Sequence, residues 1–252
     1  MTALSLQEGQ EKQAMTRNDR WTATLLVLAG VLMIVAVILV FGVAPDPANL
    51  QTSVERFSQR IFYFHVPTWW VGFLAFIVAA GAGVLYLVTS HERWDVISLS
   101  SVEIGVVFTT MGLITGSIWA KPTWNTWWTW DPRLTTAAIG WLMYIGYLML
   151  RGAIDNPQRR ARFAAVFAII AFLSVPLNFM AIRWWRTIHP VVIGSGSADA
   201  QGGFSLGPTI RLVFFFSLFA FTVLYFALMA LRTRTEWLAR EVEHLKHRII
   251  FR

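Results

Sequence analysis

The stretch Trp119-Ala-Lys-Pro-Thr-Trp124-Asn-Thr-Trp127-Trp128-Thr-Trp130-Asp131 contains five of the 13 tryptophans of the chain. It lies between two long apolar segments, so we expect it to form a loop at a membrane surface. Indole rings stack well on flat conjugated systems. We therefore interpret residues 119–131, the tryptophan-rich loop, as a platform for a large planar ligand.

The composition of the chain is that of a helical membrane protein. Its 252 residues are 56% hydrophobic and only 14% charged, and the mean hydropathy is +0.55. Soluble domains carry about 25% charged residues. The apolar segments have the length that spanning helices require, about 20 residues, whereas barrel strands need about 10 residues in alternation. The predicted fold class is therefore an all-α integral membrane protein.

Six apolar segments predict six transmembrane helices. They cover residues 21–43, 67–89, 100–118, 132–150, 163–182 and 209–231. An even number of spans places both termini on one side, and 14 of the 21 Lys and Arg residues fall in the tails and loops of that side. By the positive-inside rule, both termini are cytoplasmic. The expected organisation is a cytoplasmic tail over residues 1–20, a membrane domain over 21–231 and a second cytoplasmic tail over 232–252.

Several kinds of chemistry are excluded by what the sequence lacks. The chain has no cysteine, which excludes disulfides, iron–sulfur clusters and covalent haem attachment through a Cys-x-x-Cys-His motif. It has no Gly-x-x-x-x-Gly-Lys-Ser/Thr phosphate loop, so we expect no ATP hydrolysis by this chain and no enzymatic activity of its own. The net charge of +7 comes from basic residues that flank apolar segments, which indicates topology and not nucleic-acid binding.

The spans carry few features of their own. The second span contains the patch Gly81-Ala82-Gly83, which would allow close helix packing. The third span contains Gly105, Gly112 and Gly116, spaced roughly as one small-residue face. Glu103 and Arg211 are near span ends and are expected to reach the membrane interface. Broken helices and polar residues at the midplane, which a small-solute path would need, are scarce.

The tryptophans are distributed unevenly between the two membrane surfaces. Three fall at the inner surface, whereas nine fall at or near the outer one: Trp69, Trp70, Trp119, Trp124, Trp127, Trp128, Trp130, Trp184 and Trp185. An ordinary aromatic belt anchors helices at both interfaces and would be roughly even. The belt remains the alternative explanation, but the outer excess favours a ligand-binding surface.

Two of the five histidines, His65 and His189, lie on the outer side, each close to a pair of tryptophans. Pro67 suits the first turn of the second span, which would place His65 just before a helix N-terminus. Pro190 keeps His189 out of the α region. Two neutral imidazoles from opposite sides make a six-coordinate haem iron, whereas a bare zinc ion would need further ligands that this face does not offer.

The tryptophan-rich loop is predicted to contain a short interfacial helix that starts at Pro122. Four side chains would share one stripe of this helix: Trp124, Trp127, Trp128 and Asp131. Capping of the fourth span, which starts at Pro132, is the alternative role of Asp131. Five arginines lie on the same side, and one or two of them are expected to pair with haem propionates: Arg56, Arg60, Arg133, Arg183 and Arg186.

These residues form a specific pattern. Trp119-x-x-x-x-Trp124-x-x-Trp127-Trp128-x-Trp130-Asp131-x-Arg133-Leu134-Thr135 resembles the tryptophan-rich signature, or WWD domain, of the haem-handling proteins of cytochrome c maturation. Phe62-Tyr63-Phe64-His65-Val66-Pro67 and Trp184-Trp185-x-x-x-His189 resemble the CcmC family, haem exporter protein C, and the resemblance covers nearly the whole chain. The family usually has Gly at the position of Asn125. Asn tolerates left-handed backbone conformations, so we expect the turn to be preserved.

The resemblance implies a haem-handling subunit of the bacterial inner membrane. Such a subunit binds haem b without covalent bonds at its periplasmic face and presents it to a CcmE-like periplasmic haem chaperone. The other implied partners belong to an ABC-type complex: a CcmB-like membrane subunit, a CcmA-like ATPase and a small single-span CcmD-like protein. His65 and His189 would be the axial iron ligands. The rest of the implied site consists of Trp119, Trp124, Trp127, Trp128, Trp130, Asp131 and Arg133.

Three alternatives remain open at the level of sequence. The first is an electron carrier with a haem held by two histidines, although such haems typically lie between helices inside the bilayer. The second is a small-solute transporter or channel. The third is a purely structural membrane subunit in which the tryptophans are anchors.

Overall fold

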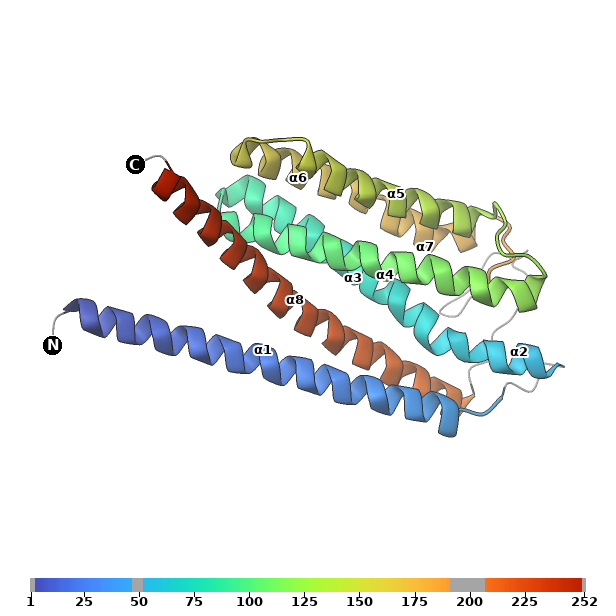
Figure 1. The fold of residues 1–252 in the computed structure, drawn as a ribbon. Helices are drawn as coiled ribbons and strands as arrows, with labels where there is room; N and C mark the ends of the chain where they lie inside the picture. The colour runs from blue at the N-terminus through green and yellow to red at the C-terminus, as the bar shows by residue number, and fades with distance from the viewer. Residues whose placement is uncertain (1–2, 47–51, 191–206, 251–252) are drawn as a thin grey trace.

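The computed structural model describes residues 3–46, 52–190 and 207–250, and within these ranges the regular secondary structure is entirely helical. Figure 1 shows the elements in the order α1 (Ala3–Gly42), α2 (Ser53–Ser58), the short 3₁₀ helix η1 (Gln59–Ile61), α3 (Phe62–Thr89), α4 (Glu92–Trp124), α5 (Pro132–Gly152), α6 (Pro157–Phe172), α7 (Ser174–Trp184) and α8 (Pro208–Ile250). The predicted all-α fold is confirmed.

Among the described residues, five segments are long and apolar enough to cross a membrane: Arg20–Gly42, Ser53–Thr89, Glu92–Trp124, Pro157–Trp184 and Pro208–Ile250. They correspond to five of the predicted spans, so the multi-span class is confirmed. α5 has 21 residues, and at 1.5 Å per residue it is about as long as the hydrocarbon core is thick, roughly 30 Å. It is not among the five apolar segments, and the sixth crossing stays a prediction.

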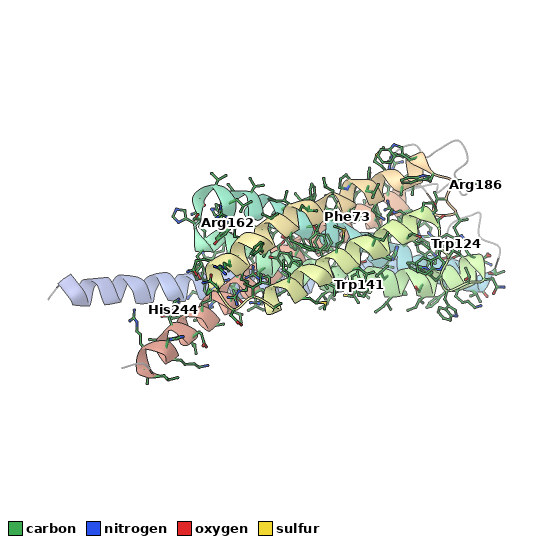
Figure 2. All side chains as sticks on the ribbon, turned by 90° about the horizontal axis from the view of Figure 1, so that it is seen from above. Phe73, Trp124, Trp141, Arg162, Arg186 and His244 are labelled. Atoms are coloured by element: carbon green, nitrogen blue, oxygen red, sulfur yellow. The ribbon has the colours of Figure 1, made fainter. Side chains whose placement is uncertain are left out.

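The helices form an elongated bundle around α3 and α4 (Figure 1). α8 packs against both of these helices and against α1, whereas α5, α6 and α7 cover the other side. The start of α1 and the end of α8 lie at one end of the bundle, called here the terminal end. The opposite end contains α2 and the connection between α4 and α5, and is called the loop end. Figure 2 shows Trp124 and Arg186 at the loop end, and Arg162 and His244 toward the terminal end.

The glycine face of α4 brings α3 very close. Three large side chains of α3 lie over the three glycines: Phe76 over Gly105, Trp69 over Gly112 and His65 over Gly116. A Cβ atom at these positions would come within 2.5, 2.7 and 2.8 Å of the respective rings. Any larger residue would therefore push α3 and α4 apart or turn these rings away. Of the two glycines at which close packing was expected in α3, Gly83 does lie against the backbone of Ala165 in α6, whereas a Cβ at Gly81 would meet nothing within 4 Å.

The second predicted span starts earlier than its proline indicates. α2, η1 and α3 follow one another without a break, so the chain is already helical when it reaches Pro67. The prediction that His65 precedes a helix N-terminus is wrong, because His65 lies in the first turn of α3. Proline removes one backbone hydrogen bond from a helix, and membrane helices tolerate this loss where other groups pack around the freed carbonyl.

The predicted interfacial helix in the tryptophan-rich loop does not form. α4 continues through Pro122 to Trp124, and residues 125–131 are not helical. Asn125 ends α4 with a left-handed φ of 55°, as expected from its tolerance of this conformation. The loop tryptophans therefore do not share one helix face, and their orientations are set by tertiary contacts.

A network of charges joins α4, α5 and α8 at the terminal end. The buried Asp95 accepts hydrogen bonds from Arg151 at 2.5 and 3.0 Å and from Arg240 at 2.7 Å. Glu103 forms an ion pair of 2.6 Å with Arg232, and its expected reach to the membrane interface stays a prediction. These contacts hold the C-terminal part of α8 against the bundle, and α8 runs without a break through the predicted domain boundary at residues 231–232.

Candidate functional site

A cavity of about 990 Å³ lies toward the loop end of the bundle. Its wall combines residues of α3, α4, α5, α7 and α8 with the segment that follows α7. Small-molecule sites usually measure about 300–1,000 Å³, so this cavity suits a large ligand. Most of its lining is apolar, with aromatic residues from several helices. The cavity brings together both outer histidines and most of the tryptophan-rich loop.

His65 lies on the cavity wall with its side chain 6% exposed. Its Nδ1 is 3.0 Å from the hydroxyl oxygen of Thr115. That hydroxyl donates its own hydrogen to the carbonyl of Met111 at 2.8 Å, so it must accept from the imidazole. The proton therefore sits on Nδ1, and Nε2 keeps the lone pair that a metal ion takes.

The imidazole of His189 has the same tautomer as that of His65. It lies in the segment after α7 and also lines the cavity. Its Nδ1 is 3.1 Å from the carbonyl oxygen of Pro190, which can only accept, so Nδ1 is again the donor and Nε2 again keeps the lone pair. Burial and the charge of Arg133 lower the pKa of His189 to about 3, which keeps the imidazole neutral at physiological pH.

Asp131 does not line the cavity but positions the segment that carries His189. Its carboxylate accepts a hydrogen bond of 2.7 Å from the hydroxyl of Thr187 and one of 3.0 Å from the backbone N–H of Ile188. The Thr187 oxygen in turn accepts a hydrogen bond of 3.0 Å from the backbone N–H of His189. Asp131 also caps α5 by accepting from the N–H of Arg133 at 2.9 Å. Its predicted capping role is confirmed, and it holds His189 in addition.

The tryptophans of the loop divide into two groups. Four of them line the cavity: Trp119, Trp124, Trp127 and Trp128. The ring of Trp119 meets His65 edge to face at 5.8 Å, and Trp124 lies 6.3 Å from the ring of His189. Trp130 is not on the wall; it is 78% exposed and packs edge-on against Trp128. The structure thus places four of the five predicted platform residues at the cavity.

Arg133 is the arginine that the described structure places on the cavity wall. It donates to the carbonyl of Asn178 at 2.6 Å, and this bond ties α5 to α7. Two other candidates for propionate binding are held elsewhere. Arg60 donates to the carbonyl of Val40 and forms an ion pair of 3.1 Å with Asp46, so it faces α1.

Arg183 donates to the carbonyl of Phe179 at 2.9 Å and lies over that ring, and it is not part of the cavity wall. Arg56 and Arg186 are also absent from the wall.

Several wall residues carried no recognisable signal in the sequence. α8 contributes Phe214, Phe215, Leu218, Phe219 and Thr222, which look like ordinary residues of an apolar span. Thr115 is not on the wall but contacts His65, and nothing in the sequence distinguishes it from the other threonines of the spans. Gln59, in η1, also lines the cavity. These positions depend on helix packing that periodicity does not reveal.

The side chains of the cavity fit an iron porphyrin better than a bare metal ion. Within the described residues there is no group of three or more His, Asp or Glu side chains that could hold a metal. Two neutral imidazoles with free Nε2 atoms complete the coordination of an iron whose other four ligands come from the porphyrin. The aromatic wall provides apolar contact for the flat ring. The site would therefore hold haem through two histidines and contacts to its faces.

Comparisons with known proteins point in the same direction. A family model described as haem exporter protein C (CcmC) matches residues 5–248. The chain is similar to haem exporter protein C of Bradyrhizobium diazoefficiens, with 34% identity over 205 residues, 81% of this chain and 74% of that protein. It is also 34% identical to haem exporter protein C of Escherichia coli K12 over 216 residues, 85% of this chain and 83% of that protein.

A third relative comes from a plant. The chain is 31% identical over 212 residues to a putative cytochrome c biosynthesis ccmC-like mitochondrial protein of Marchantia polymorpha. The match covers 83% of this chain and 86% of that protein. Similarity over about four fifths of the chain is not confined to one motif.

Proposed function

Because the chain belongs to the haem exporter protein C family, we propose that it binds haem at the periplasmic face of the inner membrane and delivers it to a periplasmic haem chaperone. Membership in the family makes the chain a multi-pass membrane component of haem transport in cytochrome c maturation. It acts as a transport component and not as an enzyme. Beyond what family membership shows, we propose which residues bind the haem, on which side of the membrane they lie, and that a periplasmic chaperone receives the haem.

The observation that carries the proposal is the pair of histidines on one cavity wall. His65 and His189 both use Nδ1 to donate a hydrogen bond, and both therefore have Nε2 available for an axial position on haem iron. Trp119 and Trp124 pack beside these imidazoles and supply apolar surface for the porphyrin ring. Arg133 is the cation on the wall that would pair with a propionate.

The bound group is haem b held without covalent bonds. The chain has no cysteine that could form thioether links to vinyl groups. Binding through iron–nitrogen bonds, ring contacts and carboxylate contacts is reversible, which a protein that hands its ligand to another must allow. Haem is therefore the cargo of this chain.

The orientation follows from charge. Lys and Arg gather in the two tails and in the loops of the terminal end, with 14 of the 21 residues there. By the positive-inside rule this end faces the cytoplasm, so the loop end with the cavity faces the periplasm. The start of α1 and the end of α8 lie at the same end of the bundle in this arrangement, as six crossings would require.

The proposed assembly is an ABC-type complex with a CcmB-like membrane subunit, a CcmA-like ATPase and a CcmD-like single-span protein. The chain has no phosphate-binding loop for ATP, so the energy source must lie on another subunit. A CcmE-like chaperone would receive the haem at the open end of the cavity.

Absorption spectroscopy of the purified full-length protein tests the site. We expect His65→Ala and His189→Ala each to lower haem occupancy and to shift the Soret band away from that of a six-coordinate haem. His91→Ala is the matched control, because His91 is exposed at the terminal end. Full haem occupancy in the double variant would refute histidine ligation.

A transfer assay separates the proposal from an electron carrier. Purified protein loaded with haem is mixed with the haem-free chaperone, and haem on each is measured after separation. We expect haem to appear on the chaperone. Haem that stays on this chain would favour the electron carrier.

A further inference from the structure

Gln59 is a buried polar residue that the proposed site does not yet use. It lies in η1, and its side chain is 8% exposed. Its Nε2 atom is buried and has no hydrogen-bond partner among the described residues. Gln59 also lines the cavity that contains His65 and His189. The neighbouring Arg60 points the other way, toward α1, and pairs with Asp46.

An unpaired amide donor in this position needs an explanation. Buried polar groups in native proteins are almost always hydrogen-bonded, because an unsatisfied donor loses its bonds to water without compensation. A leucine or methionine of similar volume would fill the same space at no such cost. Gln59 lines the cavity, so a ligand bound there is the natural source of the missing acceptor.

The chemistry of haem identifies which of its atoms could accept. The four porphyrin nitrogens are bonded to iron, and the remaining ring edge is hydrocarbon apart from two propionate groups. A carboxylate is an acceptor only, and bonds from neutral N–H groups to it are stronger than bonds between neutral groups. The buried amide nitrogen of Gln59 therefore matches a propionate and no other part of the ligand.

Two other groups on the cavity wall can also bind a carboxylate. The indole Nε1 of Trp128 is also buried without a partner in the described structure, and Trp128 lines the cavity. Arg133 supplies a positive charge on the wall. The cavity thus offers a cation and two unpaired N–H donors, which is the set of groups that carboxylates require in an apolar surrounding.

We propose that Gln59 is a carboxylate-binding residue of this site, and that its side-chain amide donates a hydrogen bond to a haem propionate. This inference rests on the proposed haem-binding function and adds a residue that orients the ring. A propionate fixed at Gln59 sets the rotation of the porphyrin about the axis between the two histidines. Iron ligation alone leaves that rotation free.

The test compares two ligands on three proteins. Purified full-length wild type, Gln59→Leu and Gln59→Glu are titrated with protohaem and with protohaem dimethyl ester, in which both carboxylates are blocked. We expect Gln59→Leu to bind protohaem about tenfold more weakly than wild type, and Gln59→Glu to bind it more weakly still because two carboxylates repel. For the dimethyl ester, Gln59→Leu should lose much less affinity relative to wild type, because a neutral ester carbonyl is a weaker acceptor than a carboxylate. Gln158→Leu, at an exposed position of α6, is the control.

Melting temperatures distinguish ligand binding by Gln59 from a structural role. If Gln59 binds the ligand, haem-free Gln59→Leu should melt at the same temperature as wild type or higher, because an unpaired donor is removed. Its haem complex should keep the wild-type Soret position, since both histidines still ligate. A lower melting temperature, or an equal loss of affinity for both ligands, would overturn the proposal. Equal protohaem affinity of Gln59→Leu and wild type would also overturn it.

The same titration separates this inference from the function on which it rests. If wild-type protein binds protohaem and Gln59→Leu binds it equally well, only the role of Gln59 fails. If wild-type protein binds neither ligand, the haem site itself fails, and the role of Gln59 fails with it.

Discussion

Asp131 accepts a hydrogen bond of 2.7 Å from the hydroxyl of Thr187, a residue 56 positions further along the chain. Asp131 also accepts from the N–H of Ile188, and Thr187 accepts from the N–H of His189. The start of α5 and the segment after α7 are thereby locked together next to the cavity. The last residue of the tryptophan-rich loop thus determines where an imidazole from a distant segment lies.

Replacement of Asp131 by Ala should therefore impair ligation by His189, although Asp131 does not touch the ligand cavity. We expect haem affinity to fall at least tenfold and the spectrum to change toward five-coordinate iron. Loss of the α5 cap should also lower the free energy of unfolding by about 1 kcal/mol.

A second variant separates these two effects. Thr187→Val removes the hydroxyl that contacts both Asp131 and the N–H of His189 and leaves the α5 cap intact, so it should change the spectrum with little loss of stability. Asp155→Ala, at an exposed loop position, is the control for removal of a carboxylate. An unchanged spectrum in both Asp131→Ala and Thr187→Val would show that His189 is held by other contacts.

The contact between Gly116 and His65 gives a prediction from packing alone. A Cβ at Gly116 would lie 2.8 Å from Cε1 of His65, so Gly116→Ala must displace the imidazole. We expect haem binding to fall as strongly as in His65→Ala. Gly81→Ala in α3 is the matched control, because a Cβ there meets nothing within 4 Å and alanine favours the helix. Equal haem content in the two glycine variants would contradict the position of His65.

The sequence predicted the two histidines and most of the aromatic wall for a physical reason. Apolar segments determine which loops share a side of the membrane, and the rare residues of one side are then confined to a small area. His65, His189 and Trp124 were identified in this way, and the structure brings all three to one cavity. The left-handed turn at Asn125 was also predicted, because few residues adopt it without strain.

Features that depend on long-range packing were not predictable. Pro67 and Pro122 appeared to start helices, but in both places the chain is already helical. Trp130 looked equivalent to its neighbours, yet it is exposed, because the orientation of a non-helical loop depends on contacts such as that between Asp131 and Thr187. Gln59 carried no pattern in the sequence, because what marks it is that its amide nitrogen has no partner among the residues that the structure describes.

The two groups of loop tryptophans provide a test of the platform. Trp124→Ala removes a ring from the cavity wall next to His189 and should weaken haem binding about tenfold. Trp130→Ala removes a ring of the same size from an exposed position and should change haem affinity less than twofold. Haem titration of the two purified variants measures the difference. Equal effects would indicate that these tryptophans serve as membrane anchors and not as a ligand surface.

The buried carboxylate of Asp95, at the terminal end, should affect the free energy of unfolding and not the ligation of haem iron. Asp95→Asn leaves the buried guanidinium of Arg151 without its counter-charge and weakens the contact to Arg240. Removing one partner of a buried ion pair costs about 3–5 kcal/mol. Unfolding by denaturant in detergent should show a loss of this size, with an unchanged Soret position in the folded fraction. Glu243→Gln, on an exposed ion pair of α8, should change stability by less than about 1 kcal/mol.

The neutral state of His189 should appear in the pH dependence of folding. Its pKa is lowered to about 3 in the folded chain by burial and by Arg133, whereas an unfolded histidine titrates near about 6.5. Between these values the unfolded chain binds a proton that the folded chain does not. The free energy of unfolding therefore falls by up to about 1.4 kcal/mol per pH unit as the pH falls between these values, and above about pH 6.5 this contribution is constant.

Denaturant unfolding of haem-free wild type and His189→Gln at pH 6, 5 and 4 measures this effect. The free energy of unfolding of the wild type should fall more steeply with decreasing pH than that of the variant. Parallel curves would mean that His189 is solvated in the folded protein, and therefore not held in the apolar cavity.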